Sequence, residues 1–165
     1  MGTLTAVTGD TDLSVAVWVK FDKGNMDVTG KIIDCNYYSD YSYKGFQMYF
    51  DYASQKVRFA CHQNDILGYA AATTDVGDDM WHFLVGVRDR TGSGKFKFYV
   101  DGVLDAEGQA THQGDIVAST GNAYYTLGSH CAKTMGYFEG YIDEVMVFDK
   151  ALSPTEVEYL YENGM

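Results

Sequence analysis

The chain of 165 residues is long enough for one domain, which at this size buries roughly 70% of the surface of the unfolded chain. Hydrophobic residues make up 46% and aromatic residues 15%, which excludes a disordered chain. The net charge of −11 argues against nucleic acids and anionic membranes as partners, because both require a basic footprint. It is compatible with sugars, cations or a basic protein surface, or with solubility alone. No apolar run approaches ~18 residues, so we expect no membrane insertion.

The N-terminal part of the chain predicts strands separated by a turn. Residues 4–7 indicate a short edge strand, and residues 8–12 form a turn rich in oxygen atoms. Residues 14–21 alternate in the pattern of a strand, with Trp18 on the face opposite the valines. We therefore expect both faces of this strand to be covered. A further strand is expected at residues 31–35.

Residues 36–45, with the sequence NYYSDYSYKG, predict a ten-residue loop that holds four tyrosines. Strands follow at residues 46–52 and 57–62, where apolar and polar side chains alternate. Residues 66–74 predict a weaker strand.

Residues 81–102 predict a β-hairpin, since two alternating apolar runs flank a Thr-Gly-Ser-Gly turn. Trp81 and Phe83 share one face of the first run, and Phe96 and Phe98 share one face of the second. We expect all four rings to lie in the core, so this hairpin is interpreted as scaffold.

The C-terminal part predicts strands at residues 123–128 and 137–148, the second almost continuously apolar and therefore expected inside a sheet. Ser153, a following proline and Glu156 predict a helix with a capping box, which Gly164 can end. The pattern of ten to twelve strands with one short helix predicts an all-β, two-sheet antiparallel sandwich, with residues 1–165 as a single domain.

The tyrosine-rich stretch is the main candidate for ligand binding, because flat rings beside amides and carboxylates can recognise sugars. Two or three rings folded back over the sandwich edge, or a protein contact, are the alternatives. A polar tip after residues 57–62 is expected on the same rim, unless it is an ordinary turn. The candidate ligand-binding residues are Asn36, Tyr37, Tyr38, Asp40, Tyr41, Tyr43, His62, Asn64 and Asp65.

Several segments together resemble the laminin G-like, concanavalin A-like lectin/glucanase jelly-roll superfamily, particularly its pentraxin-like branch. The resemblance implies a jelly-roll sandwich and an extracellular module that binds glycans, proteins or calcium. The matching segments are LSVAVWVKF (13–21), GFQMYF (45–50), WHFLVGVRDRTGSGKFKFYVDG (81–102), TLGS (126–129) and YFEGYIDEVMVFDKALSPTEVEYLY (137–161).

The resemblance also implies where calcium could bind. In pentraxin-like lectins, one calcium loop corresponds to residues 36–45 and the other to residues 129–133, where this chain has no carboxylate. That site is therefore incomplete, because calcium takes six to eight oxygen ligands. A structural calcium held by Asp10, Asp12 and Asp143 is the remaining metal candidate, with turns and caps as the alternative role of these residues.

Catalysis is not expected. Glucanases of this fold place alternate carboxylates on one strand face, whereas Asp143 and Glu144 are adjacent and point to opposite faces. No other catalytic motif is present. Cys35, Cys61 and Cys131 allow at most one internal disulfide.

We therefore expect a non-catalytic carbohydrate-binding or adhesion module of an extracellular or surface protein. A structural module that associates with itself or a neighbour in a fibre, filament or virion is the alternative, and a glycanase is a weaker third. Residues 1–10 lack the features of a signal peptide, so the chain is expected to be cytosolic as written or a module of a longer exported protein.

Overall fold

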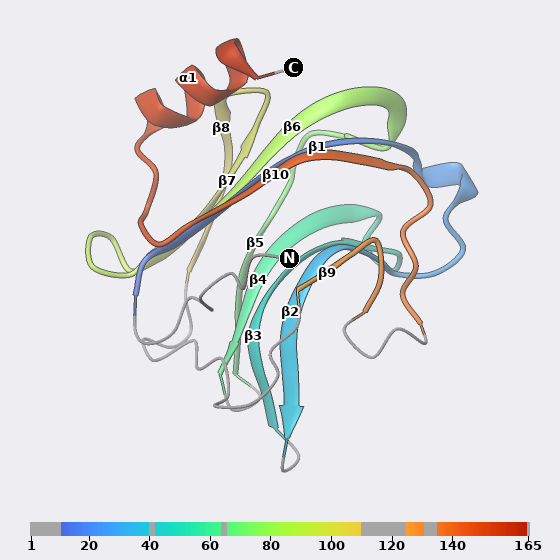
Figure 1. Cartoon of the computed structure of the whole chain (residues 1–165), viewed down its shortest axis with the longest axis horizontal. Coiled ribbons are helices and arrows are strands. Elements are labelled where there is room, and N and C mark those ends of the chain that lie inside the picture. The colour runs from blue at the N-terminus through green and yellow to red at the C-terminus, as the bar shows by residue number, and fades with distance from the viewer. Residues whose placement is uncertain (1–10, 40–41, 64–65, 110–124, 131–134, 165) are drawn as a thin grey trace.

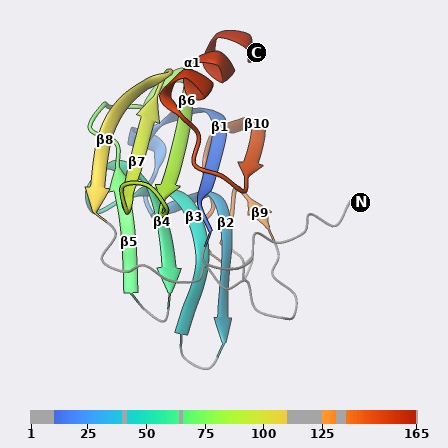
Figure 2. The same cartoon turned by 90° about the vertical axis from the view of Figure 1, so that its left-hand side faces the viewer.

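The computed structural model describes residues 11–39, 42–63, 66–109, 125–130 and 135–164, with backbone only for residues 36–39, 42–44, 63, 66 and 109. Ten strands form two five-stranded antiparallel sheets packed face to face, a jelly-roll sandwich (Figures 1 and 2). We call them sheet I, in the order β10-β1-β6-β7-β8, and sheet II, in the order β5-β4-β3-β2-β9. The predicted all-β sandwich is confirmed.

The strands of sheet I are β1 (Leu13–Asp22), β6 (Asp78–Asp89), β7 (Lys95–Val100), β8 (Val103–Gln109) and β10 (Tyr141–Phe148). The strands of sheet II are β2 (Gly30–Ser39), β3 (Ser42–Asp51), β4 (Lys56–Gln63), β5 (Ile66–Ala71) and β9 (Thr126–Leu127). A single turn of 3-10 helix, η1 (Lys23–Asn25), follows β1, and α1 (Pro154–Asn163) ends the described chain. The predicted strand at residues 4–7 lies outside the described residues.

The main core fills the space between the two sheets. Its packing is tight where a glycine of one sheet meets a ring of the other: a Cβ on Gly86 would lie 2.1 Å from Cγ of Phe59. Gly108 of β8 approaches the backbone of β5 just as closely, since a Cβ there would lie 1.9 Å from the Tyr69 carbonyl oxygen. The sheets are therefore held in one fixed relation. Buried residues of this core include Val15, Val17, Val19, Phe21, Phe46, Met48, Phe50, Phe59, Phe96 and Phe98.

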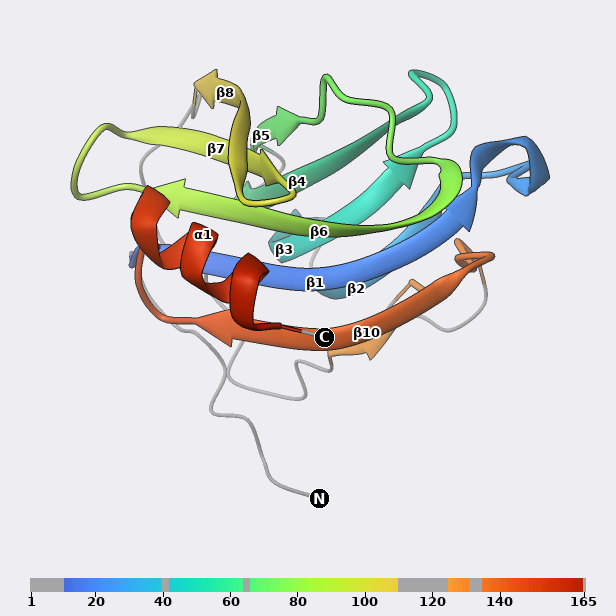
Figure 3. The same cartoon turned by 90° about the horizontal axis from the view of Figure 1, so that it is seen from above.

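A second, smaller core lies on the outer face of sheet I, beneath α1 (Figure 3). Helix α1 begins at Ser153, whose side chain accepts a hydrogen bond from the Glu156 amide while the Glu156 side chain accepts one from the Ser153 amide. This is the predicted capping box. The expectation that both faces of β1 are covered is also confirmed, because the Trp18 ring stacks on Tyr161 with the centroids 5.7 Å apart. The buried members are Ala16, Phe83, Val85, Val87, Tyr99, Leu152 and Val157.

The predicted hairpin is present as β6 and β7, but its four aromatic residues do not share one core. Phe83 packs under α1, whereas Phe96 and Phe98 pack between the sheets. Trp81 is 36% exposed, so the expectation that it is buried was wrong. Helix α1 has ten residues and is only about 15 Å long, so it covers part of this sheet face and not the start of β6.

Two further expectations were wrong. Residues 36–45 do not form a ten-residue loop, since β2 and β3 stay paired as far as Ser39 and Ser42. Strand β10 does not lie inside a sheet, because it is an end strand of sheet I in the described part of the chain. Its apolar side chains are shielded instead by packing against both cores, to which Ile142, Met146 and Phe148 contribute.

Candidate ligand-binding face

The outer face of sheet II carries polar side chains in alternation with the core. Along β4, Val57, Phe59 and Cys61 are buried between the sheets, so Arg58 and His62 lie on the other face, as their positions predict. On β3, Gln47 lies between the core residues Phe46 and Met48. Figure 1 shows that β2 and β3 curve, with their concave side directed away from sheet I. The polar side chains therefore line a concave surface.

A chain of contacts crosses this face from β2 to β4. Lys31 Nζ donates a hydrogen bond to Oε1 of Gln47, and the amide nitrogen of Gln47 lies 2.7 Å from Nε2 of His62. The Lys31 ammonium also lies 4.2 Å from the centroid of the Tyr49 ring, a cation–π contact. Both Gln47 and Tyr49 are buried. We call Lys31, Gln47 and His62 the polar track.

Arg58 organises the half of the face nearer β5. Its guanidinium lies 2.9 Å from Oδ2 of Asp51, and its Cζ lies 4.9 Å from the centroid of the Tyr69 ring. Burial raises the pKa of Tyr49, although a hydrogen bond with Arg58 acts in the opposite direction. Tyr49 is thus a neutral phenol at ordinary pH, and Tyr69 presents an exposed ring.

A hollow of about 570 Å³ opens at the start of β2. The segment after β9 forms one of its walls and is fixed to β2 at two points: Gly128 N donates to Ile32 O at 3.0 Å, and Lys31 N donates to Gly136 O at 2.9 Å. The Tyr137 side chain, 56% exposed, is the aromatic group of the lining. The lining residues are Val28, Thr29, Lys31, His130, Met135, Gly136 and Tyr137.

Behind this hollow lies Asp34, a carboxylate with no solvent exposure. Its Oδ2 is 3.8 Å from Nε2 of His130, within the range of an ion pair when the imidazole is protonated. Thr126 donates a hydrogen bond to the carbonyl of Ser129 at 2.8 Å, which fixes the turn that carries His130. The hollow therefore combines an exposed ring with an ammonium and an imidazole.

The predicted tyrosine site lies at the far end of the same sheet. Tyr37 and Tyr38 are the last but two and last but one residues of β2, and Tyr43 stands opposite Tyr38 on β3. Asn36 is opposite Gly45, which in turn is opposite His62, so the polar track ends beside the base of this hairpin. The expectation of a common rim is confirmed for His62. Asp40, Tyr41, Asn64 and Asp65 lie outside the described residues.

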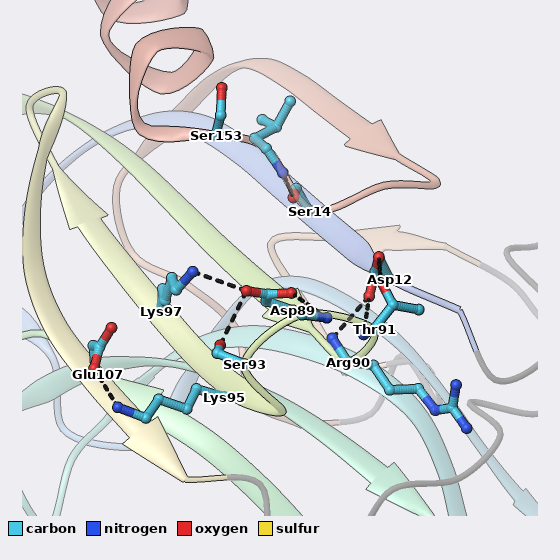
Figure 4. A network of polar contacts seen from close by, with 12 residues as sticks. Asp12, Ser14, Asp89, Arg90, Thr91, Ser93, Lys95, Lys97, Glu107 and Ser153 are labelled. Carbon is cyan, nitrogen blue, oxygen red and sulfur yellow. Dashed lines mark hydrogen bonds and ion pairs between the residues drawn. The ribbon is translucent and has the colours of Figure 1, made fainter.

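Two of the three predicted metal ligands, Asp12 and Asp143, are not brought together. Asp12 accepts hydrogen bonds from the backbone amides of Arg90 and Thr91, at 2.7 and 2.9 Å, and from the Thr91 hydroxyl (Figure 4). Asp143 stands opposite Trp18, six residues further along β1, which corresponds to about 20 Å. Asp10 lies outside the described residues. Asp12 therefore fixes the turn that follows β6, and it lies too far from Asp143 for the two carboxylates to bind one ion.

Most residues of this face were not predicted from the sequence, namely Lys31, Gln47, Tyr49, Arg58, Tyr69, His130 and Tyr137. One signal was available. Polar or amphipathic side chains recur on the face opposite the core in three consecutive strands, such as Gln47 and Tyr49 of β3 and Arg58 and His62 of β4. Such a pattern predicts a polar sheet face, but not which side chains contact each other across strands.

The two described cysteines take no part in a site. Cys35 and Cys61 are buried thiols and not members of a disulfide. Burial raises the pKa of Cys61 to about 12, and the nearby charge of Arg88 lowers it less. A thiol in this state is a poor nucleophile. Cys131 lies outside the described residues.

Comparisons with known proteins place the sequence and the fold. Residues 3–158 match the family described as the concanavalin A-like lectin/glucanases superfamily. No curated protein matches the chain. Among the described residues, no helix is long and apolar enough to cross a membrane.

Several solved structures share the fold. A protein from Bacteroides ovatus, named for expected carbohydrate binding, has a TM-score of 0.69 at 14% identity, covering 96% of this chain and 42% of its own. The binding domain of botulinum neurotoxin DC, solved with rat synaptotagmin II, has a TM-score of 0.66 at 16% identity, covering 92% and 35%. A structure of botulinum neurotoxin type C, whose cell entry depends on interaction with two ganglioside molecules, has a TM-score of 0.67 at 16% identity. It covers 92% of this chain and 35% of its own. This chain spans less than half of each.

Proposed function

The chain belongs to the concanavalin A-like lectin/glucanase superfamily, and on that premise we propose that it is a non-catalytic glycan-binding module of a secreted or surface protein. The observation that carries the proposal is the hollow at the start of β2, where the exposed Tyr137 ring stands beside Lys31 and His130. A sugar presents apolar C–H faces and hydroxyl groups. An aromatic ring with hydrogen-bonding groups around it matches both.

The polar track supports an extended ligand. It leads from the hollow at Lys31 through Gln47 to His62, beside the base of the tyrosine hairpin. An oligosaccharide lying along the concave face would contact the hollow at one end. At the other end it would reach the tyrosine hairpin, where Tyr38 of β2 is paired with Tyr43 of β3 at positions that alternation assigns to the concave face. Buried, mutually bonded side chains cost little conformational entropy on binding, which favours affinity.

The proposal is tested by calorimetric titration with neutral oligosaccharides selected on a glycan array. Tyr137→Ala is expected to weaken binding by roughly threefold to tenfold, the usual worth of an aromatic contact. Tyr38→Ala with Tyr43→Ala is expected to weaken it further for long ligands only. Tyr159→Ala is the matched control, because this tyrosine is 64% exposed but lies on α1.

The result that overturns the proposal is the absence of glycan binding, or binding that none of these tyrosine substitutions changes. Binding of a protein instead, or concentration-dependent self-association in light scattering, would favour the structural alternative. Release of sugars from β-glucans would contradict the non-catalytic assignment. Calcium remains a prediction from the family resemblance, and a melting temperature equal in calcium and in chelator would dismiss a tight site.

A further inference from the structure

A row of exposed residues crosses the outer face of sheet I beyond α1. Lys20 of β1 is opposite Trp81 of β6 on one side and opposite Tyr141 of β10 on the other. Trp81 is 36% exposed and Tyr141 is 66% exposed. Their ring centroids are 6.3 Å apart and their planes are inclined by 49°. Two large rings thus flank one lysine on the protein surface.

The helix leaves this row uncovered. Tyr161 of α1 stacks on Trp18 and on Phe83, with centroids 5.7 and 6.2 Å away, and both partners lie two residues short of the exposed row. Figure 3 shows that the ends of β1, β6 and β10 extend past α1. Exposed rings that could bury a large apolar area are typical of surfaces that bind a ligand.

A hollow of about 600 Å³ adjoins this row, and Lys20 and Tyr141 are part of its lining. Two residues of β6, Asp79 and Met80, stand opposite the single Phe21 of β1, which is a β-bulge with Asp79 at a positive φ of 65°. A bulge redirects side chains, and this one brings the Asp79 carboxylate to the hollow, 3.6 Å from Lys20 Nζ. The polar residues that line it are Lys20, Asp22, Asn25, Asp79, Glu139 and Tyr141.

From this arrangement we infer a second binding site, separate from the concave face of sheet II, for a neutral oligosaccharide. The three carboxylates of the lining, Asp22, Asp79 and Glu139, repel an anionic ligand, and the ammonium of Lys20 between the two rings repels a cationic group stacked on them. Sugar hydroxyls both donate and accept, so they can bond to the ammonium and to the carboxylates together. The mixed lining thus suits a neutral polyol.

The inclination of the rings defines the ligand further. One C–H face of a sugar ring cannot stack on two planes inclined by 49°, so Trp81 and Tyr141 require two sugar units that are rotated relative to each other. The site therefore takes a chain of at least two units and not a monosaccharide. A module with one site on each sheet could join two glycan chains.

The test follows the indole N–H resonance of Trp81 by NMR during titration with hexasaccharides. The chain has two tryptophans, so Trp81→Phe assigns the signal. The probes are neutral hexamers of glucose, mannose, xylose and N-acetylglucosamine, with the de-acetylated cationic glucosamine hexamer and an anionic galacturonate hexamer as charged counterparts. A neutral hexamer is expected to shift the resonance, its monosaccharide and the charged hexamers are not, and Tyr141→Ala is expected to weaken the effect roughly threefold to tenfold.

Lys20→Met tests the charge argument on the same protein. With the ammonium removed and the carboxylates kept, the cationic glucosamine hexamer is expected to gain affinity relative to its neutral N-acetyl counterpart. The inference is overturned if no neutral hexamer shifts the Trp81 resonance, or if a charged hexamer binds the wild type there more tightly. Tyr137→Ala separates the two sites: it is expected to leave the Trp81 response intact even if the concave face binds nothing.

Discussion

The outer faces of the two sheets differ in what lies on them. On sheet I, α1 covers Phe83, Val85 and Val87, and the covered part of the face is apolar. On sheet II no described helix is present, and the corresponding positions carry Gln47, Arg58 and His62. The comparison shows that the polarity of the side chains depends on whether a helix covers the face. Apolar side chains gather where a helix packs, and hydrogen-bonded polar side chains gather where ligand or water can reach.

The strongest test of this difference is Phe83→Ala. The ring has no solvent exposure and belongs to the core under α1, so its loss is expected to cost about 3–5 kcal/mol of unfolding free energy. Tyr69→Ala, on the other sheet, is the control and is expected to cost far less because its ring is exposed. Urea denaturation measures both. Equal losses would contradict the contrast between the two faces.

A second test removes the centre of the polar track. Gln47→Ala takes away the acceptor of Lys31 and the partner of His62, and the loss of these two partly buried hydrogen bonds is expected to cost about 1–3 kcal/mol. The glycan affinity of the concave face should fall together with stability. Gln55→Ala, in an exposed turn, is the control, and denaturation with calorimetric titration gives both quantities. A neutral effect of Gln47→Ala would mean that the track does not organise the face.

A third, smaller effect is expected at the start of α1. Ser153→Ala removes the side-chain acceptor of the Glu156 amide and is expected to cost about 1 kcal/mol, the usual value for a helix N-cap. Ser153→Asp retains a capping oxygen and should keep most of the stability. Thermal unfolding monitored by the near-UV signal of Trp18, which contacts α1, measures the difference.

The smallest effect is a pH dependence. A hydrogen bond from Lys150, helped by the Ser153 amide and hydroxyl, lowers the pKa of Glu156 from 4.5 to about 2. A carboxyl whose pKa is lowered by folding stabilises the fold above its ordinary pKa, and this contribution is lost as the pH falls from about 4.5 to about 2. Glu156→Gln should make the acid limb of the stability curve shallower in that window. An unchanged slope would contradict the assignment.

The parts of the fold that depend on side-chain alternation were predictable. The hairpin of β6 and β7, the two covered faces of β1 and the capping box at Ser153 were all expected and are all present. Local patterns define these features, because period-two alternation and capping residues act over a few positions.

The parts that depend on distant segments were not predictable. Trp81 carries the same apolar pattern as Phe83, and only the length and position of α1 leave one exposed and the other buried. Likewise Lys31, Gln47 and His62 are separated by sixteen and fifteen residues, and only the register of three strands brings them into contact. The tyrosine-rich stretch was predicted as a loop because its Asn, Ser, Asp and Gly residues are typical of loops. Strands β2 and β3 nevertheless stay paired as far as Ser39.

The shape of β10 bears on how copies of the domain could meet. Strand β10 has an irregularity in its pairing with β1. Ala16 and Trp18 of β1 are separated by one residue, whereas their partners on β10, Met146 and Asp143, are separated by two. One of these two, Glu144, has a positive φ of 45°. An end strand with such an irregularity offers a second chain two short stretches whose hydrogen-bonding groups are out of step. A neighbouring strand could match one stretch only by losing the other. Edge-to-edge addition at β10 is therefore disfavoured by geometry, and copies that meet at this edge would have to do so through side chains.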